Sequence, residues 1–129
     1  MIDVWIADDH PIVRAGLRHI VADVASIRVV GESADADDLL AKIQGATADV
    51  LLLDASMPGP GVFELLHRLA ENRPDLRVLV LGDHPVEHVA LRMLQHGASG
   101  PAEVEAALES LCLAFERAKP AAAARWKKA

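Results

Sequence analysis

Aromatic residues are scarce in this sequence, which has two tryptophans, two phenylalanines and no tyrosine, or 3% of its 129 residues. The core must therefore be built from Leu, Val, Ile and Ala, in keeping with a hydrophobic content of 52%. A chain of this length can bury one ordinary hydrophobic core. We expect one soluble globular domain.

Cysteine is nearly absent, since Cys112 is the single one. One thiol excludes a disulfide framework and a cysteine metal site within one chain, and it favours a reducing, cytoplasmic setting. No apolar run approaches the roughly 18 residues that a membrane span needs. No signal peptide opens the sequence. We therefore expect a cytoplasmic protein without membrane contact.

Positive charge is also in short supply, with 13 Lys and Arg against 19 Asp and Glu and a formal net charge of −6. Contacts with nucleic-acid phosphates need clustered Lys and Arg. We therefore expect no direct nucleic-acid contact by this chain.

Short apolar runs alternate with amphipathic segments along the sequence. The runs are 3–8, 28–33, 48–54 and 77–82, and their consecutive apolar residues are typical of parallel strands covered on both faces. Five segments have a helical pattern: one that begins at Pro11, one over about 36–46, one over 63–69, one that follows Pro85 and ends at Gly97, and one from Val104 to Phe115. The first stripe includes Ile12, Ala15, Leu17, Ile20 and Val24, the third begins with Phe63, and the last includes Ala107, Leu108, Leu111 and Cys112. This alternation predicts an α/β fold with a doubly wound parallel sheet.

Aspartates follow the first and third predicted strands. The run IDVWIADDHP ends on Asp8 and Asp9, and Asp54 ends the run ADVLLLD. Right-handed crossovers bring these two strands together if the second strand lies at the edge, and ligands bind at the carboxyl ends of such strands. Adjacent carboxylates repel each other, so a positive group or water should lie nearby. Three carboxylates suffice for Mg²⁺, which prefers oxygen ligands and keeps several waters.

Each aspartate taken alone has a simpler interpretation, at about even odds, as a cap or turn residue. Asp9, which precedes His10 and Pro11, is placed to be a helix N-cap. His10 is more readily a loop residue than a catalytic base. Asp54 precedes the Pro/Gly loop of LLLDASMPGPG, which would leave its carboxylate exposed. A carboxylate beside Mg²⁺ can attack a phosphoryl group and become an acyl phosphate.

Four segments, VWIADDHPIVRAGL, VVGES, ADVLLLDASMPGPGVFELLHRL and RVLVLGDHPVEHVALRMLQHGASG, together resemble a bacterial two-component response-regulator receiver domain. The similarity covers about residues 2–100 and is greatest to the subfamily with a C-terminal helix-turn-helix output domain of the LuxR type. It implies a flavodoxin-like sheet of strand order 2-1-3-4-5. We expect a receiver domain over 1–118 and a linker or tail over 119–129.

By position, the resemblance implies that Asp54 is the phosphoacceptor and that Asp8 and Asp9 bind Mg²⁺. The backbone carbonyl of Ser56 would be a further metal ligand. A sensor histidine kinase or a small phosphodonor would supply the phosphoryl group, and self-phosphorylation on Asp54 would be the only catalytic activity. The phosphorylated form would then dimerise, through the fourth and fifth helices, or release its own or a partner's output domain. Transcription would be controlled through that output domain.

Two departures make the sequence atypical of the family. Gly82 stands where the family has Thr or Ser at the switch position, and no Lys occurs between Lys42 and Lys119, so the lysine that pairs with the phosphate is absent. After Gly100 the last helical pattern begins almost at once, and at roughly 3.3 Å per residue ASG cannot form a fifth strand and connect two helices. Either the protein lacks the fifth strand or the sequence as given omits a loop.

Two other functions are open. A degenerate receiver would keep the acidic pocket and act without phosphorylation, through protein contacts or a small ligand. Gly82 and the absent Lys favour it, whereas the complete set of Asp8, Asp9 and Asp54 favours a phosphoacceptor. A metal-dependent hydrolase is less favoured, since haloacid-dehalogenase-type enzymes need an Asp where Ser56 stands.

Overall fold

The computed structural model describes residues 1–55, 57–81, 104, 106–111, 113–114 and 117. Within residues 1–81, four strands and three helices alternate: β1 (Ile2–Ala7), α1 (Pro11–Ala22), β2 (Ile27–Ser33), α2 (Ala36–Ile43), β3 (Val50–Asp54), α3 (Val62–Asn72) and β4 (Arg77–Leu81). The strands pair in parallel in the order β2-β1-β3-β4. Among the described residues, no helix is long and apolar enough to cross a membrane.

The predicted doubly wound sheet is confirmed, and the observed order agrees with the first four strands of the flavodoxin-like order 2-1-3-4-5. The predicted strand limits are correct to within two residues. The segment expected to hold the fourth helix and the fifth strand, together with Gly82, lies outside the described residues, as does the predicted tail over 119–129.

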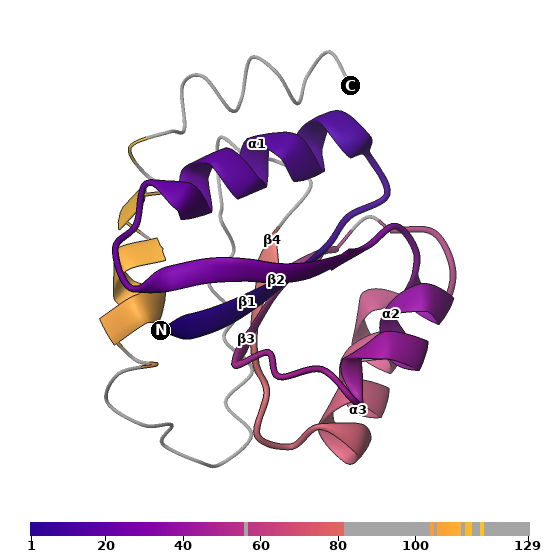
Figure 1. Ribbon diagram of the computed structural model, residues 1–129. Helices are drawn as coiled ribbons and strands as arrows, with labels where there is room; N and C mark the ends of the chain where they lie inside the picture. The colour runs from indigo at the N-terminus through magenta and orange to yellow at the C-terminus, as the bar shows by residue number, and fades with distance from the viewer. Residues whose placement is uncertain (56, 82–103, 105, 112, 115–116, 118–129) are drawn as a thin grey trace.

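Helices cover both faces of the sheet, α1 on one and α2 and α3 on the other (Figure 1), and buried apolar side chains form a layer on each face. One layer joins the sheet to α1 and to the described helical residues 104 and 106–111, and the other joins it to α2 and α3. All residues of β1, β3 and β4 are buried. Because both faces of these strands are covered, their sequences are apolar on consecutive residues rather than on alternate ones.

The buried stripe of α1 differs from the predicted one. Val13, Leu17 and Val21 are its buried residues. Ile12, predicted to face inward, is 70% exposed, and Ala15 is also exposed. The buried positions follow one another at intervals of four, which selects one face of the helix and turns Ile12 away from it.

The apolar pattern of α3 was also too broad. Leu65, Leu66 and Leu69 are buried, whereas Phe63 is 82% exposed. At about 100° per residue, Phe63 lies roughly 110° around the helix from the centre of the stripe that these leucines form, and so falls outside that stripe. In the last helix, the prediction that Val104, Ala107, Leu108 and Leu111 face the core is confirmed. Cys112 and Phe115 lie outside the described residues.

A β-bulge interrupts the pairing of β1 with β2. Val4 lies opposite Val29 and Trp5 lies opposite Gly31, so Val30 is an extra residue in β2. A bulge of one residue reverses the faces of all side chains that follow it in the strand. Gly31 therefore lies under the indole of Trp5, and the indole nitrogen donates a hydrogen bond of 3.0 Å to Ser33 Oγ.

Candidate metal-binding site

An acidic cluster lies at the carboxyl edge of the sheet, where β1 and β3 run side by side. Ala7 of β1 pairs with Leu53 of β3, so the residues that follow them, Asp8 and Asp54, emerge next to each other. The ligand atoms of Asp8, Asp9, His10 and Asp54 all lie within 4.8 Å of one another. The structure thus brings together the three carboxylates that the sequence singled out.

Asp8 is the most buried member of the cluster, with 3% of its side chain exposed. Burial raises the pKa of Asp8 to about 6. The hydrogen bond of 2.8 Å that the backbone N–H of His10 donates to Asp8 Oδ1 opposes this shift, and the charges of Asp54 and Asp9 add to it. Bringing a cation into the cluster would relieve this repulsion and favour the ionised form.

The expectation that Asp9 caps α1 is wrong. The N-cap residue is His10, which has an extended backbone and makes no side-chain capping bond, and Pro11 occupies the first turn. Asp9 Oδ1 is buried and accepts no hydrogen bond within the described part of the chain, although His10 Nδ1 lies 3.0 Å away. Asp9 Oδ1 can therefore accept a further contact, and it lies beside the carboxyl groups of Asp8 and Asp54. Together these oxygens are the kind of ligands that a hard cation such as Mg²⁺ prefers.

His10 is a member of the cluster that the sequence reasoning missed. Its Nδ1 lies 3.4 Å from Asp8 Oδ1 as well as 3.0 Å from Asp9 Oδ1, and 45% of its side chain is exposed. Its position directly after two aspartates was the available signal. Since Mg²⁺ prefers oxygen ligands, the three carboxylates suit such an ion better than the imidazole does.

A positive group also lies beside the acidic pair, as their repulsion led us to expect. The guanidinium of Arg14, one turn into α1, donates a hydrogen bond of 2.7 Å from NH1 to the backbone carbonyl of Asp8. The same side chain donates from Nε to Glu32 Oε1 at 3.2 Å. Arg14 therefore links α1 to the ends of both β1 and β2.

The loop after Asp54 is held by backbone hydrogen bonds. Ala55 N donates to the Leu81 carbonyl at 2.9 Å, which ties the loop to the end of β4, and Met57 N donates to the Asp54 carbonyl at 3.4 Å. Gly59 has a φ of +120°, a conformation that favours glycine. Ser56, whose carbonyl was predicted as a metal ligand, and the switch position Gly82 lie outside the described residues.

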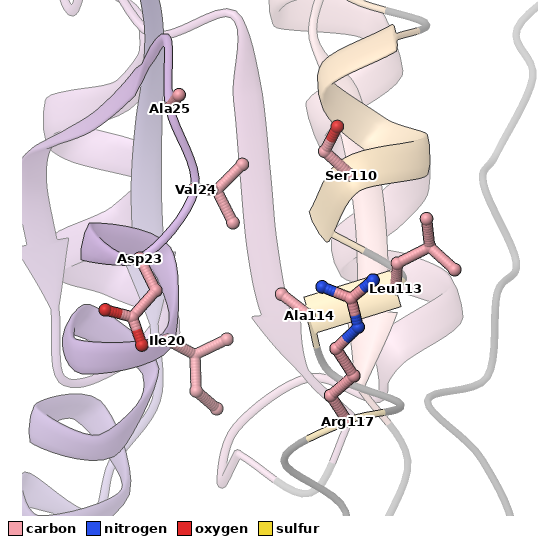
Figure 2. Close-up of a pocket in the computed structure, with 8 residues that line it drawn as sticks. All are labelled: Ile20, Asp23, Val24, Ala25, Ser110, Leu113, Ala114 and Arg117. Carbon is pink, nitrogen blue, oxygen red and sulfur yellow. The ribbon is translucent and has the colours of Figure 1, made fainter.

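A separate cavity of about 590 Å³ lies at the other end of α1 (Figure 2). It is lined by the apolar side chains of Ile20, Val24, Leu113 and Ala114 and by the charged Asp23 and Arg117, among others. The 12 residues of α1, about 18 Å at 1.5 Å per residue, separate it from the acidic cluster. The cavity is therefore not part of the metal site.

Comparison with known proteins identifies the family. Residues 4–111 match the response regulator receiver domain model. The chain is 36% identical to the response regulator UvrY of Escherichia coli (strain K12) over 118 residues, covering 86% of this chain and 54% of UvrY. It is 33% identical to the response regulator GacA of Pseudomonas aeruginosa over 117 residues, covering 91% of this chain and 55% of GacA. It thus spans about half the length of these curated relatives.

Solved structures agree with this result. RcsB from Salmonella enterica serovar Typhimurium, bound to promoter rprA in the presence of the phosphomimetic BeF3⁻, matches with a TM-score of 0.63 and 31% identity, covering 90% of this chain and 63% of that one. A LuxR-family response regulator from Aurantimonas sp. SI85-9A1 matches with a TM-score of 0.64 and 31% identity, covering 86% and 84%. The chain therefore belongs to the response regulator receiver domain family.

Proposed function

We propose that this domain is a phosphoacceptor, with Asp54 as the phosphorylated residue and Asp8, Asp9 and Asp54 as ligands of Mg²⁺. The observation that carries the proposal is the convergence of three carboxylates within 4.8 Å at the carboxyl edge of the sheet. Bound Mg²⁺ would supply charge neutralisation for the phosphoryl oxygens. We propose the carbonyl of Ser56 as a further ligand, from the family resemblance.

In the proposed reaction, a carboxylate oxygen of Asp54 attacks the phosphorus atom and forms an acyl phosphate. The bond from phosphorus to the donor breaks, and the electron pair leaves with a histidine of the kinase or with acetate from acetyl phosphate. Asp54 ends β3 and is only 9% exposed, so the expectation of an exposed carboxylate is wrong, and the pairing of β1 with β3 sets its position next to Asp8. No catalytic activity beyond this self-phosphorylation is proposed.

The signal would be read by an output domain. The relatives UvrY and GacA are response regulators whose matched regions make up only 54% and 55% of their length, and RcsB is described bound to a promoter. We propose that a sensor histidine kinase phosphorylates the receiver domain, residues 1–118, in the cytoplasm, and that residues 119–129 form a linker or tail. The output domain, rather than this chain, would contact DNA, with dimerisation through the fourth and fifth helices.

Intact-mass spectrometry before and after incubation with Mg²⁺ and acetyl phosphate tests the proposal. We expect a gain of one phosphoryl group in the wild type and none in Asp54→Asn, which keeps the shape of the side chain but removes the nucleophile. Asp9→Asn should bind Mg²⁺ more weakly and be phosphorylated more slowly. The untreated mass also shows whether a loop is present after Gly100.

An unphosphorylated wild type that binds Mg²⁺ in calorimetry would contradict the phosphoacceptor role and favour a degenerate receiver. Unchanged Mg²⁺ affinity in Asp9→Asn would contradict the assignment of the metal ligands.

A further inference from the structure

We propose that Arg14 and Glu32 form a positioning pair for the metal site, in which Glu32 holds the guanidinium of Arg14 and Arg14 holds the turn that carries Asp8 and Asp9. This inference rests on the proposed function, because it concerns the Mg²⁺ affinity of that site.

The hydrogen bonds of Arg14 connect the metal site to two other elements. Nη1 of Arg14 lies 2.7 Å from the carbonyl oxygen of Asp8, which belongs to the turn between β1 and α1. Nε of the same side chain lies 3.2 Å from Glu32 Oε1 in β2. Only 18% of the Arg14 side chain is exposed, so solvent competes weakly for these bonds.

The β-bulge places Glu32 where Arg14 can reach it. Glu32 pairs with Ile6, whose side chain lies in the apolar layer under α1. Without the extra residue Val30, the pairing would shift by one position and turn Glu32 toward the opposite face. Arg18, one turn further along α1, donates to both carboxylate oxygens of Glu32 at 2.6 Å, which restrains the carboxylate further.

Fixing the Asp8 carbonyl restricts the backbone between the two acidic residues. This carbonyl and the nitrogen of Asp9 belong to the same planar peptide group. The hydrogen bond from Arg14 therefore limits the orientation of the Asp9 backbone, and with it the direction of the Asp9 side chain. The hydrogen bonds of Arg14 go to the Asp8 carbonyl and to Glu32 rather than to a carboxylate of the acidic cluster, so Arg14 would act on the metal site through the backbone. Outer partners that orient metal ligands commonly contribute 10- to 100-fold to metal affinity.

Calorimetric titration of the apo protein with Mg²⁺ tests the pair, without reference to phosphorylation. Arg14→Met should raise the Kd for Mg²⁺ about 10-fold, since the side chain keeps its apolar length but loses both hydrogen bonds. Arg14→Lys should recover part of this loss, because the ammonium group can still donate to one of the two partners. The recovery should be incomplete, because a single ammonium lacks the planar geometry that spans both partners. Arg68→Met is the matched control, since the guanidinium of Arg68 bonds Glu64 within α3 rather than Asp8 or Glu32, and its Kd should stay within about 2-fold of wild type.

A double-mutant cycle tests whether Glu32 acts through Arg14. Glu32→Gln should weaken Mg²⁺ binding in the wild type and have little further effect in Arg14→Met. Equal Mg²⁺ affinity in wild type, Arg14→Met and Arg14→Lys would overturn the inference, even if their melting temperatures differ, since that result indicates a purely structural role. Wild-type protein that binds no Mg²⁺ would instead contradict the proposed function.

Discussion

Asp8 shows the conflict between function and stability at the scale of one residue. It lies almost wholly out of solvent, beside two further carboxylates. Burial is the main cause that raises the pKa of Asp8 to about 6. At neutral pH the ionised carboxylate therefore lowers the free energy of unfolding. A metal site needs this clustering of like charge, whereas the apo fold does not.

We therefore predict that Asp8→Asn stabilises the metal-free protein. The pKa of Asp8 is raised from 3.8 to about 6 on folding, so the protonated carboxyl favours the folded state below the unfolded pKa, and this contribution is lost as pH rises through about 6. At pH 8 in EDTA the variant should be more stable than wild type by about 3 kcal/mol, since the pKa rises by about two units and one unit corresponds to about 1.4 kcal/mol. Chemical denaturation at pH 8 and pH 4 measures this difference.

The advantage of Asp8→Asn should shrink toward pH 4, where the wild-type carboxyl is protonated. A pH-independent difference in the free energy of unfolding would contradict the raised pKa.

At the scale of an element, β2 depends on its bulge. A Cβ at Gly31 would lie 2.1 Å from Cζ3 of Trp5, a distance that real atoms do not tolerate. The bulge that brings Gly31 under Trp5 also turns Glu32 toward α1. Glycine at position 31 thus permits the bulge, and the bulge in turn places Glu32 where it bonds Arg14 beside the proposed metal site.

We predict that Gly31→Ala destabilises the domain by about 1–3 kcal/mol, because the added methyl group must displace a buried indole ring. Gly45→Ala is the control, since a Cβ there meets nothing within 4 Å, and its effect should stay within about 0.5 kcal/mol. Urea denaturation of both variants measures the two changes. Equal free energies of unfolding for Gly31→Ala and Gly45→Ala would contradict the prediction, because they would show that the indole of Trp5 can move aside without loss of stability.

The first turn of α1 provides a second prediction at this scale. Ile12 is 70% exposed and lies two residues beyond His10 of the acidic cluster. An exposed apolar side chain beside a phosphoacceptor site suits contact with a protein phosphodonor. Ile12→Ala should therefore slow phosphotransfer from a histidine kinase several-fold and leave phosphorylation by acetyl phosphate unchanged.

Leu113→Ala is the matched control for Ile12→Ala, since Leu113 is 57% exposed and lines the cavity at the other end of α1. Radiolabel transfer assays with both donors make the comparison. An equal loss with acetyl phosphate would indicate damage to the acidic site rather than loss of a docking contact.

At the scale of the whole molecule, the proposed cation binding would be linked to folding. The proposed ligands come from the ends of β1 and β3, which are adjacent only when the sheet has formed. A ligand that binds only the folded chain stabilises it in proportion to the logarithm of its concentration.

We predict that Mg²⁺ at ten times its Kd stabilises the wild type by about 1.4 kcal/mol, which raises the melting temperature by about 5 °C. Asp9→Asn should show a smaller shift at the same concentration. Thermal denaturation followed by circular dichroism, with KCl of equal ionic strength as the control, measures this. A shift of the same size in both proteins would indicate a general salt effect.

Much of the fold followed from local patterns. Consecutive apolar residues predicted strands buried on both faces, and Asp8 and Asp54 at the ends of two such strands predicted a shared acidic edge. The exposure of Ile12 and Phe63 could not be predicted, because an apolar residue beside a helical stripe is compatible with either face.

The sequence by itself determined the alternation of strands and helices, the parallel sheet and the gathering of three carboxylates, because these depend on periodicity and on where each strand ends. The tertiary structure alone decided the bulge at Val30, the contact of Arg14 with the Asp8 carbonyl and its pairing with Glu32, and the entry of His10 into the cluster. The bulge and the pairing of Arg14 with Glu32 depend on strand register, and a shift of one residue in β2 would turn Glu32 to the other face of the sheet. The contacts of Arg14 and His10 with the turn after β1 depend on side-chain distances that a sequence pattern does not specify.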